Sequence, residues 1–463
     1  MYFPGRKQED EMKSDIVAIG GGPAGIITAL TAKSVYPDKS VCVVKEIGDG
    51  VIPCAIPYMM KTIKDPRLNI MANKPLEDAG IDITVRKVES LDVKNHRVIF
   101  SGGDFMSYEK VVLATGTEAV IPPIHGVDLP GVYTIEKSLA FLTALRGKVK
   151  SARNVVIIGG GFIGAEFADE LSRLTSVNVH LIEAMPKLLY NAFDNEFCDD
   201  AAQILTLQGV NTHTNCRVSS IDGDTGVTSV TLENGEKIPA DLVLVSIGAK
   251  PSIELAQKAG LRIAENDSIW VDEYMRTSVD DIFAVGDCAL KRDFFTRKAV
   301  PVWLASTATA EARNAGTNIY GIRVIHQIQG TVAAFSTKIG NLSLASAGMT
   351  CRSCQKEGFR EVSATAKAPD RHPGIIPGAS MMTVKLIFAD RSGIILGGQA
   401  SGGASVGEMI NVIAFAIQKK VTVREIDMMQ VATHPLLTSA PTVHPLVNAA
   451  HLALAKLRST ARA

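Results

Sequence analysis

Short apolar runs alternate with amphipathic segments along the first two thirds of the chain. Residues 15–19 and 41–44 have the length and apolar character of buried strands, and residues 24–34 between them have the spacing of a helix. The same alternation begins again near Asn154 and continues to Gly248. Because strands that alternate with helices are typical of parallel sheets, the pattern predicts two successive α/β units.

The last third of the chain has a different pattern. Residues 332–339 and 382–388 predict antiparallel strands, and the turn-forming segment 390–393 predicts a hairpin. An amphipathic helix is expected at 405–419. The chain has 463 residues, which corresponds to about three domains of roughly 150 residues each. We therefore expect an α+β domain after the two α/β units.

Each α/β unit contains a glycine motif directly after an apolar strand. In such a motif the first glycine permits a tight turn, the second leaves room for a pyrophosphate, and the third lets the following helix pack on the strand. Two copies in the same context predict two dinucleotide sites, and hence electron transfer between dinucleotides, most simply NAD(P)H and FAD. The glycines are Gly20, Gly22 and Gly25 in the first unit and Gly159, Gly161 and Gly164 in the second.

The composition excludes several other classes of partner. Lys plus Arg and Asp plus Glu are balanced at 48 each, which gives no reason to expect nucleic acid or a charged membrane surface. No apolar run reaches the roughly 18 residues of a membrane span. Residues 1–14 are polar and lack a signal-peptide core, and the seven scattered cysteines fit reduced thiols. We expect a cytoplasmic protein with an N-terminal extension at 1–14.

Further short motifs give the chain a family resemblance. A strand at 110–113 ends in the turn Ala114-Thr115-Gly116, and a strand at 281–285 ends in Gly286-Asp287. With the two glycine motifs, these segments resemble the FAD-dependent pyridine nucleotide-disulfide oxidoreductase family over nearly the whole chain. The resemblance implies an NAD-binding domain inserted into an FAD-binding domain, followed by an α+β domain that forms a homodimer. The implied boundaries are 15–120 and 250–325 for FAD, 121–249 for NAD, and 326–463 for dimerisation.

The resemblance also implies roles for individual residues. Asp287 would bind the ribityl chain of FAD, and the helix that begins near Ala305 would point its N-terminus at the flavin pyrimidine end. Phe162 would either gate the nicotinamide pocket or serve packing alone. The remaining residues expected at the cofactors lie in the turns around them: Pro23, Ala24, Ala114, Thr115, Gly116, Gly286, Ile163 and Gly248.

Acidic residues after the second strand of each unit are candidates to bind a ribose. Glu183 follows Gly159 by about the 20 residues expected of a carboxylate that accepts hydrogen bonds from a ribose diol. A carboxylate there repels a 2′-phosphate, which favours NADH over NADPH. In the first unit we expect Glu46 to bind the FAD ribose, although the family usually has its acid where Lys45 stands. The alternative for Glu46 is an exposed Lys-Glu pair.

Cys54 is the candidate redox residue, in the segment Cys54-Ala55-Ile56-Pro57-Tyr58. Two-cysteine disulfide reductases carry a CxxxxC pair in this region, but Met59 stands at the second position. The segment instead resembles the single-cysteine coenzyme A-disulfide, coenzyme A-persulfide and polysulfide reductases. A thiol at a helix start beside a flavin is expected to have a lowered pKa and to attack a disulfide or persulfide sulfur as the thiolate.

His434 is a second catalytic candidate. His434-Pro435 is similar to the His-Pro that two-cysteine reductases place over the partner subunit's thiols as an acid/base. The coenzyme A-disulfide reductases usually have a tyrosine in this region, which this chain lacks. An ordinary packed or interface histidine is an equal alternative for His434.

These features predict a homodimeric flavoenzyme that passes electrons from NADH through FAD and Cys54 to a sulfur substrate such as coenzyme A disulfide, coenzyme A persulfide or polysulfide. One alternative is an NADH oxidase, in which oxygen oxidises the flavin directly or Cys54 passes through sulfenic acid. The other is a redox sensor or electron carrier that uses Cys351 and Cys354, which the resemblance places at an exposed helix start. Two cysteines supply only half of a zinc site, so no metal is expected.

Overall fold

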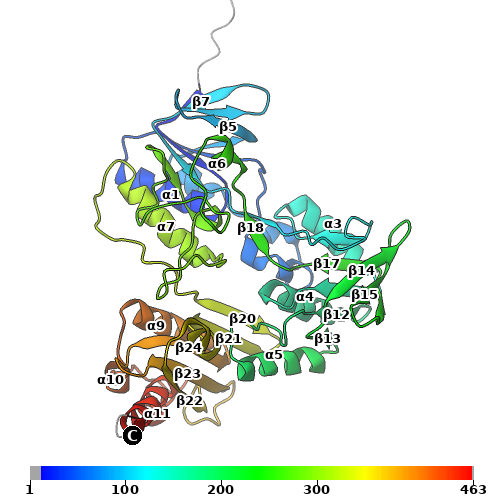
Figure 1. The fold of residues 1–463 in the computed structure, drawn as a ribbon, viewed down its shortest axis with the longest axis vertical. Coiled ribbons are helices and arrows are strands. Elements are labelled where there is room, and N and C mark those ends of the chain that lie inside the picture. Colours follow the sequence, from blue (N-terminus) through cyan, green and yellow to red (C-terminus); the bar gives the residue numbers. More distant parts are fainter. Residues whose placement is uncertain (1–11, 461–463) are drawn as a thin grey trace, which may run out of the picture.

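The computed structural model describes residues 12–460. The first α/β unit contains a sheet of five parallel strands in the order β19-β8-β2-β3-β4, with helices α1 and α7 packed against each other beside it (Figure 1). The strands are β2 (Ile16–Ile19), β3 (Val41–Lys45), β4 (Asp82–Val85), β8 (Lys110–Leu113) and β19 (Ile282–Ala284), and the helices are α1 (Pro23–Val35), α2 (Lys74–Asp78), α6 (Glu254–Lys258) and α7 (Ala305–Asn318).

The second unit repeats this architecture. Its five parallel strands have the order β10-β17-β11-β12-β13, and a three-stranded antiparallel sheet, β14-β15-β16, lies beside them. The parallel strands are β10 (Val132–Thr134), β11 (Asn154–Ile158), β12 (Asn178–Ile182), β13 (Asn211–His213) and β17 (Leu242–Val245). The other elements are α3 (Leu139–Ser151), α4 (Phe162–Ser172), α5 (Asn195–Leu207), β14 (Val218–Gly223), β15 (Val227–Leu232) and β16 (Lys237–Pro239).

Two antiparallel strands connect the units. The chain leaves the first unit on β9 (Thr117–Ala119) and returns on β18 (Ala249–Pro251), and these strands pair with each other between the units (Figure 1). The second unit is therefore an insertion in the first, as the resemblance implies.

A small sheet at the end of the first unit changes one expectation. Its strands have the order β1-β7-β6-β5, with bounds β1 (Met12–Lys13), β5 (Val88–Asp92), β6 (Arg97–Phe100) and β7 (Phe105–Ser107). Residues 12 and 13, which we assigned to the N-terminal extension, form its edge strand and pair with β7. Residues 1–11 lie outside the described part of the chain.

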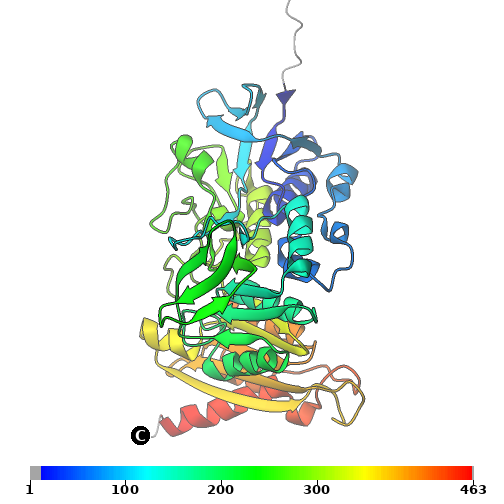
Figure 2. The same ribbon diagram turned by 90° about the vertical axis from the view of Figure 1, so that its right-hand side faces the viewer.

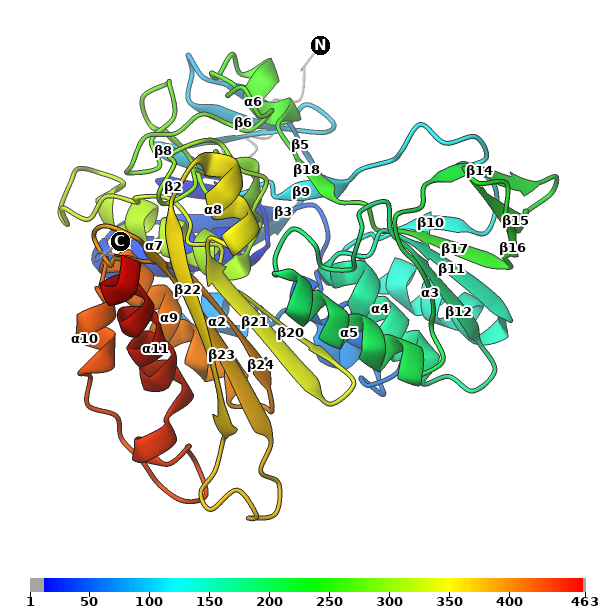
Figure 3. The same ribbon diagram turned by 60° about the horizontal axis from the view of Figure 1, so that its bottom comes forward.

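The C-terminal domain is an antiparallel sheet covered by helices. Its order is β20-β21-β24-β23-β22, and Figure 3 shows α9, α10 and α11 gathered on one side of it. The elements are β20 (Phe335–Ile339), β21 (Leu342–Gly348), α8 (Cys351–Glu357), β22 (Glu361–Pro369), β23 (Met381–Ala389), β24 (Ile395–Gly402), α9 (Val406–Gln418), α10 (Val423–Asp427) and α11 (Pro445–Thr460). Alternating apolar residues of β23 and β24 face α9 and α11 and form the core of this domain.

The second unit packs against the C-terminal sheet, as Figures 1 and 2 show. Asp194, just before α5, accepts hydrogen bonds from Lys385 and Gln399, at 2.8 and 2.7 Å, and all three residues are buried. Arg352 at the start of α8 donates to the carbonyl of Tyr190 in the same loop. This polar contact fixes the second unit on the sheet face opposite α9 and α11.

The predicted fold class is confirmed, with two parallel α/β units and an antiparallel α+β domain. The observed bounds of the predicted strands and helices differ from the expected ones by at most three residues. In the described part of the chain, no helix has both the length and the apolar character needed to cross a membrane.

Candidate functional site

The first glycine turn has the close contacts that require glycine. Gly20 has a φ of +128°, and a Cβ there would lie 2.1 Å from the carbonyl oxygen of Ala114. A Cβ on Gly25 would lie 1.9 Å from the carbonyl oxygen of Gly20, so α1 packs directly on the turn. A Cβ on Gly22, the N-cap of α1, would meet nothing within 4 Å. Open space therefore lies at the N-terminus of α1, where a pyrophosphate fits.

The second glycine turn repeats these contacts. Gly159 has a φ of +107°, and a Cβ there would lie 2.6 Å from the carbonyl oxygen of Ser246. A Cβ on Gly164 would lie 1.8 Å from the carbonyl oxygen of Gly159, whereas Gly161, the N-cap of α4, faces open space. Each turn lies where the strand order of its sheet reverses, which is where open α/β sheets bind dinucleotides.

Glu183 lies directly beside the second turn. Its carboxylate accepts hydrogen bonds from the backbone N–H of Gly160 and of Met185, both at 2.6 Å. A Cβ on Gly160 would lie 2.9 Å from the Glu183 Cβ, so the carboxylate reaches the turn only because position 160 is glycine. This geometry suits the carboxylate of an NADH ribose site.

The first turn has no equivalent acid. Glu46 is exposed, and its carboxylate lies 3.5 Å from Lys87 Nζ, away from the glycines. Lys45, the last residue of β3, lies beside Gly21 instead. The structure therefore does not bring Glu46 to the expected ribose position and matches the alternative of an exposed pair, although with Lys87. The reason is that β3 ends at Lys45, whose side chain occupies the place beside the turn, and Glu46 is the first residue after the strand.

The Gly286-Asp287 loop lies between the N-termini of two helices. A Cβ on Gly286, whose φ is +74°, would lie 2.8 Å from Ala24 Cβ in α1 and 3.6 Å from Ala308 Cβ in α7. Ala305 is the first residue of α7, and its side chain is exposed. Asp287 and Ala305 therefore lie next to the first glycine turn, where the resemblance places FAD.

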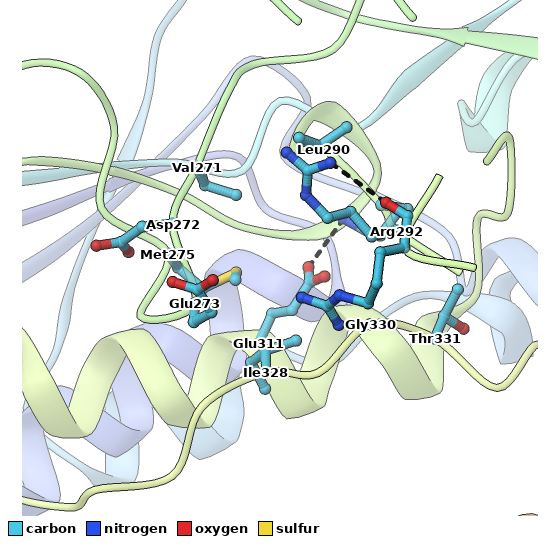
Figure 4. Close-up of a pocket in the computed structure, with 12 residues that line it drawn as sticks. Val271, Asp272, Glu273, Met275, Leu290, Arg292, Glu311, Ile328, Gly330 and Thr331 are labelled. Carbon is cyan, nitrogen blue, oxygen red and sulfur yellow. Dashed lines mark hydrogen bonds and ion pairs between the residues drawn. The ribbon is translucent and has the colours of Figure 1, made fainter. Parts of the chain in front are cut away.

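A buried ion pair that the sequence analysis missed holds this loop. Lys291 Nζ lies 2.9 Å from the carboxylate of Glu311, and both side chains are only 2% exposed. Glu311 projects from α7 toward the segment that carries Leu290 and Arg292 (Figure 4). Its carboxylate accepts the N–H of Gly286 at 2.9 Å, and Lys291 donates to the carbonyl of the same residue. The ion pair thus fixes both polar groups of the Gly286 backbone.

Cys54 is exposed and lies in the three-residue 3₁₀ helix Pro53–Ala55, between β3 and α2. Met59, at the place of the second cysteine in two-cysteine reductases, is fully buried, and its sulfur accepts a hydrogen bond from Asn69. None of the seven cysteines, all within the described residues, forms a disulfide. The segment thus presents a single accessible thiol.

The protein groups around Cys54 do not produce the expected lowering of its pKa. The surrounding protein raises the pKa of the thiol, first by desolvation and then through the negative charges of Glu166 and Asp287, whereas Lys137 lowers it. A 3₁₀ helix of only three residues adds almost no dipole to oppose these effects. Of the charged side chains that act on the thiol, Lys137 is the one that favours the thiolate.

Glu166 is the most perturbed acid near Cys54. It lies on α4, accepts a hydrogen bond from Thr337 at 2.7 Å, and burial raises its pKa to about 7. Lys137 donates to the carbonyl and hydroxyl of Thr117, both at 3.1 Å. The sequence analysis did not single out Glu166. The feature that could have revealed it is an acidic residue between the buried apolar residues Ala165 and Phe167 of one helix. Sequence gave no signal for Lys137, because its approach to Cys54 depends on the packing of the two units.

These charges lead to a testable result for Cys54. Because negative Glu166 disfavours the thiolate, Glu166→Gln is expected to lower the pKa of Cys54, and Lys137→Met to raise it. The rate of iodoacetamide alkylation of Cys54, followed from pH 6 to 10 in a variant whose other cysteines are serines, measures both shifts. The pH midpoint should move down in the first variant and up in the second. Midpoints that move together, or not at all, would contradict this account.

Phe162 packs against another domain. Its ring stacks on Phe335 of β20, with ring centroids 4.9 Å apart and an angle of 20° between the planes. On the same helix Asp169 accepts the N–H of Gly340, beside the bond from Thr337 to Glu166. The helix that begins at the second glycine turn is therefore bonded to the β20–β21 hairpin. Ile163, one residue further on, is exposed at the turn.

His434 is not brought to Cys54 within the described residues of one chain. Its side chain is exposed, and its Nδ1 accepts the N–H of Leu436 at 3.2 Å. The carbonyls of Pro435 and Thr438 in the same loop accept hydrogen bonds from the backbone N–H and ring Nδ1 of His372. The loop is thus held against the β22–β23 hairpin, and any role of His434 at Cys54 requires a second subunit.

Cys351 and Cys354 lie in α8, as expected, but they do not form an exposed pair. Cys354 is fully buried and Cys351 half-buried. Burial raises the pKa of both thiols, to about 11 for Cys351 and about 12 for Cys354. Such thiols are poor nucleophiles at neutral pH, which disfavours a redox role for this pair.

The fold and the two glycine turns define a class of protein, the two-dinucleotide oxidoreductases. Comparison with known proteins identifies the family. Residues 14–315 match the family model described as pyridine nucleotide-disulphide oxidoreductase, and residues 334–444 match the model for its dimerisation domain. The chain belongs to the pyridine nucleotide-disulphide oxidoreductase family, with FAD and NADH as its cofactors.

Individual relatives match over nearly their whole length. An NADH oxidase from Methanocaldococcus jannaschii is 33% identical, covering 95% of this chain and 99% of that protein. An NAD(P)H coenzyme A polysulfide/persulfide reductase from Pyrococcus horikoshii is 32% identical, covering 95% and 98%. Among solved structures, an NAD-dependent persulfide reductase from A. fulgidus matches with a TM-score of 0.88 and 29% identity, covering 97% of this chain and 84% of that chain.

Proposed function

We propose that this protein is an NADH-dependent reductase of a sulfur substrate, which is a disulfide, persulfide or polysulfide such as coenzyme A disulfide. The observation that carries the proposal is the single accessible thiol of Cys54, which lies within the electrostatic reach of Glu166, Lys137 and Asp287. Glu166 and Lys137 come from the second α/β unit, and Asp287 comes from the first. Charged residues of both units therefore surround Cys54. Sulfur reductases among the relatives support the same substrate class.

The chain's own residues suit this reaction. The first turn with Asp287 and Ala305 would hold FAD, and the second turn with Glu183 would hold NADH. FAD, when bound, supplies the transfer of electrons from the nicotinamide to sulfur. The thiolate of Cys54 attacks one sulfur of the substrate, forms a mixed disulfide and releases the other sulfur as a thiolate. Reduction by two electrons, with protons, then frees the second thiol and restores Cys54.

We propose that the protein acts as a homodimer in which the partner's copy of His434 protonates the leaving thiolate. The support is the dimerisation-domain match and the exposed position of His434 on a loop fixed by His372. The seven free cysteines support a reducing compartment, and we propose the cytoplasm. We also propose that residues 15–120 and 250–325 bind FAD, that residues 121–249 bind NAD, and that residues 326–463 form the dimer.

NADH oxidase activity is the second candidate. It is supported by the relative from M. jannaschii, which is named an NADH oxidase. In that case hydrogen peroxide, formed from oxygen with two electrons of NADH, would transfer one oxygen atom to the Cys54 thiolate, giving a sulfenic acid and releasing hydroxide, or oxygen would bypass Cys54 altogether.

The chemical state of Cys54 during turnover separates the two candidates. The protein is incubated with NADH and with coenzyme A disulfide, polysulfide or air. It is then alkylated and digested, and the mass of the peptide that contains Cys54 is measured by mass spectrometry. A reductase should show a coenzyme A mixed disulfide or a persulfide on Cys54 with a sulfur acceptor. Sulfenic acid in air, with no sulfur adduct from either acceptor, would contradict the reductase.

Glu183 provides the test of cofactor choice. Glu183→Ala removes the carboxylate that would bind the ribose diol and repel a 2′-phosphate, so the KM for NADH should rise about 10-fold while the KM for NADPH falls. Glu233→Ala, an exposed acid of the same domain, is the matched control. Steady-state kinetics with both nucleotides measure the change. An unaltered ratio of the two KM values would show that Glu183 does not bind the ribose.

A further inference from the structure

The two α/β units share one backbone geometry at the end of their second strands, so their residues can be matched without reference to another protein. In the first unit the N–H of Gly20 donates to the carbonyl of Val44, at 2.8 Å. In the second unit the N–H of Gly159 donates to the carbonyl of Ile182, also at 2.8 Å. Val44 and Ile182 are therefore equivalent, and so are the next residues, Lys45 and Glu183.

The side chains confirm this equivalence. A Cβ on Gly160 would lie 2.9 Å from Glu183 Cβ, and a Cβ on Gly21 would lie 2.9 Å from Lys45 Cβ. Each side chain thus passes over the middle of its glycine turn. The position that holds the candidate ribose acceptor Glu183 in the second unit holds a cation, Lys45, in the first.

The side chain of Lys45 is buried and hydrogen-bonded beside the first glycine turn. It is 8% exposed, and its ammonium donates to the carbonyl of Gly48 and to Oδ1 of Asn73, both at 2.7 Å. An ammonium has three donors, so one remains. Lys45 and Asn73 line a small cavity together with Gly21 and Gly50, so they border open space beside the turn.

We propose that Lys45 binds the adenosine ribose of FAD with the opposite hydrogen-bond polarity to Glu183. Its free N–H donates to a ribose hydroxyl oxygen, whereas a carboxylate would accept the hydroxyl protons. Asn73 fixes the direction of the ammonium. The first unit therefore recognises its ribose through a donor, and Glu46 takes no part in binding.

The test compares FAD with FMN, which lacks the adenosine half. The full-length chain is stripped of flavin and titrated with each flavin while flavin fluorescence is followed. Lys45→Met keeps a long side chain against Gly21 and removes the ammonium with all of its donors. It should raise the Kd for FAD about 10-fold and leave the Kd for FMN within about twofold.

Lys45→Glu tests the sign of the interaction. A carboxylate at this position would face the acceptor oxygens of Gly48 and Asn73, so the Kd for FAD should rise at least as much as in Lys45→Met. A tighter FAD complex in Lys45→Glu would overturn the proposal, because it would show that the ribose requires an acceptor here.

Two further results would also overturn it. Equal losses of FAD and FMN affinity, with a lower melting temperature of the stripped protein, would show that Lys45 only braces the loop through Asn73. A loss of FAD affinity in Glu46→Gln, with none in Lys45→Met, would return the ribose to Glu46. Because none of these titrations involves NADH or a sulfur acceptor, the result is independent of the proposed activity.

Discussion

Replacing Cys54 by serine is expected to lower NADH-dependent reduction of coenzyme A disulfide or polysulfide by about 10³-fold or more, because the variant lacks the nucleophile that forms the mixed disulfide. Reduction of the flavin by NADH should stay within about twofold of wild type, since Cys54 does not belong to either dinucleotide turn. Steady-state turnover with the sulfur acceptor and anaerobic bleaching of the flavin absorbance measure these two steps separately.

Cys351→Ser is the matched control for this prediction. It also removes one thiol, but one that lies in α8 and that burial makes unreactive. Its turnover with sulfur acceptors should equal that of wild type. If Cys351→Ser abolished turnover and Cys54→Ser did not, electrons would leave through the α8 pair, as in the electron-carrier alternative.

The second large effect is expected at the buried ion pair. Glu311→Gln leaves the ammonium of Lys291 buried without its counter-charge, which should cost about 3–5 kcal/mol in the free energy of unfolding. The same change weakens the support of the Gly286-Asp287 loop. The Kd values for FAD and FMN should therefore rise together, because the ribityl chain is common to both flavins. Urea unfolding and flavin titration measure the two effects.

A double variant separates stability from flavin binding. Lys291→Met with Glu311→Leu replaces both charges by apolar groups and should recover most of the lost stability. Flavin affinity should stay low, because neither replacement can hold the N–H or the carbonyl of Gly286. If the double variant bound flavin as well as wild type, the pair would have no positioning role.

The sequence predicted those parts of the site that are formed by residues close together along the chain. Each glycine turn connects a strand and a helix that are adjacent in the chain. The sequence therefore predicted that Gly25 and Gly164 let their helices pack closely on the turns. Glu183 could be found because it follows its strand directly. At Glu46, the first residue after β3, the same reasoning named a side chain that the structure leaves exposed, because Lys45 occupies the place beside the turn.

Other parts depend on contacts between distant segments. The pKa of Cys54 reflects Glu166 from α4 and Asp287 from the second half of the FAD unit, and no local pattern places these groups beside the thiol. The Lys291–Glu311 pair forms because α7 packs against the Gly286 loop. Sequence therefore indicated the residue that reacts, but not the charges that control its reactivity.

The most direct test of the central claim is single-turnover reoxidation. The protein is reduced anaerobically with one equivalent of NADH and mixed in a stopped-flow instrument with coenzyme A disulfide, polysulfide or oxygenated buffer in turn. We expect a sulfur acceptor to reoxidise the flavin faster than oxygen does, and Cys54→Ser to lose the sulfur reaction alone. Reoxidation that is fast only with oxygen, and equal in wild type and Cys54→Ser, would contradict this claim and identify an NADH oxidase.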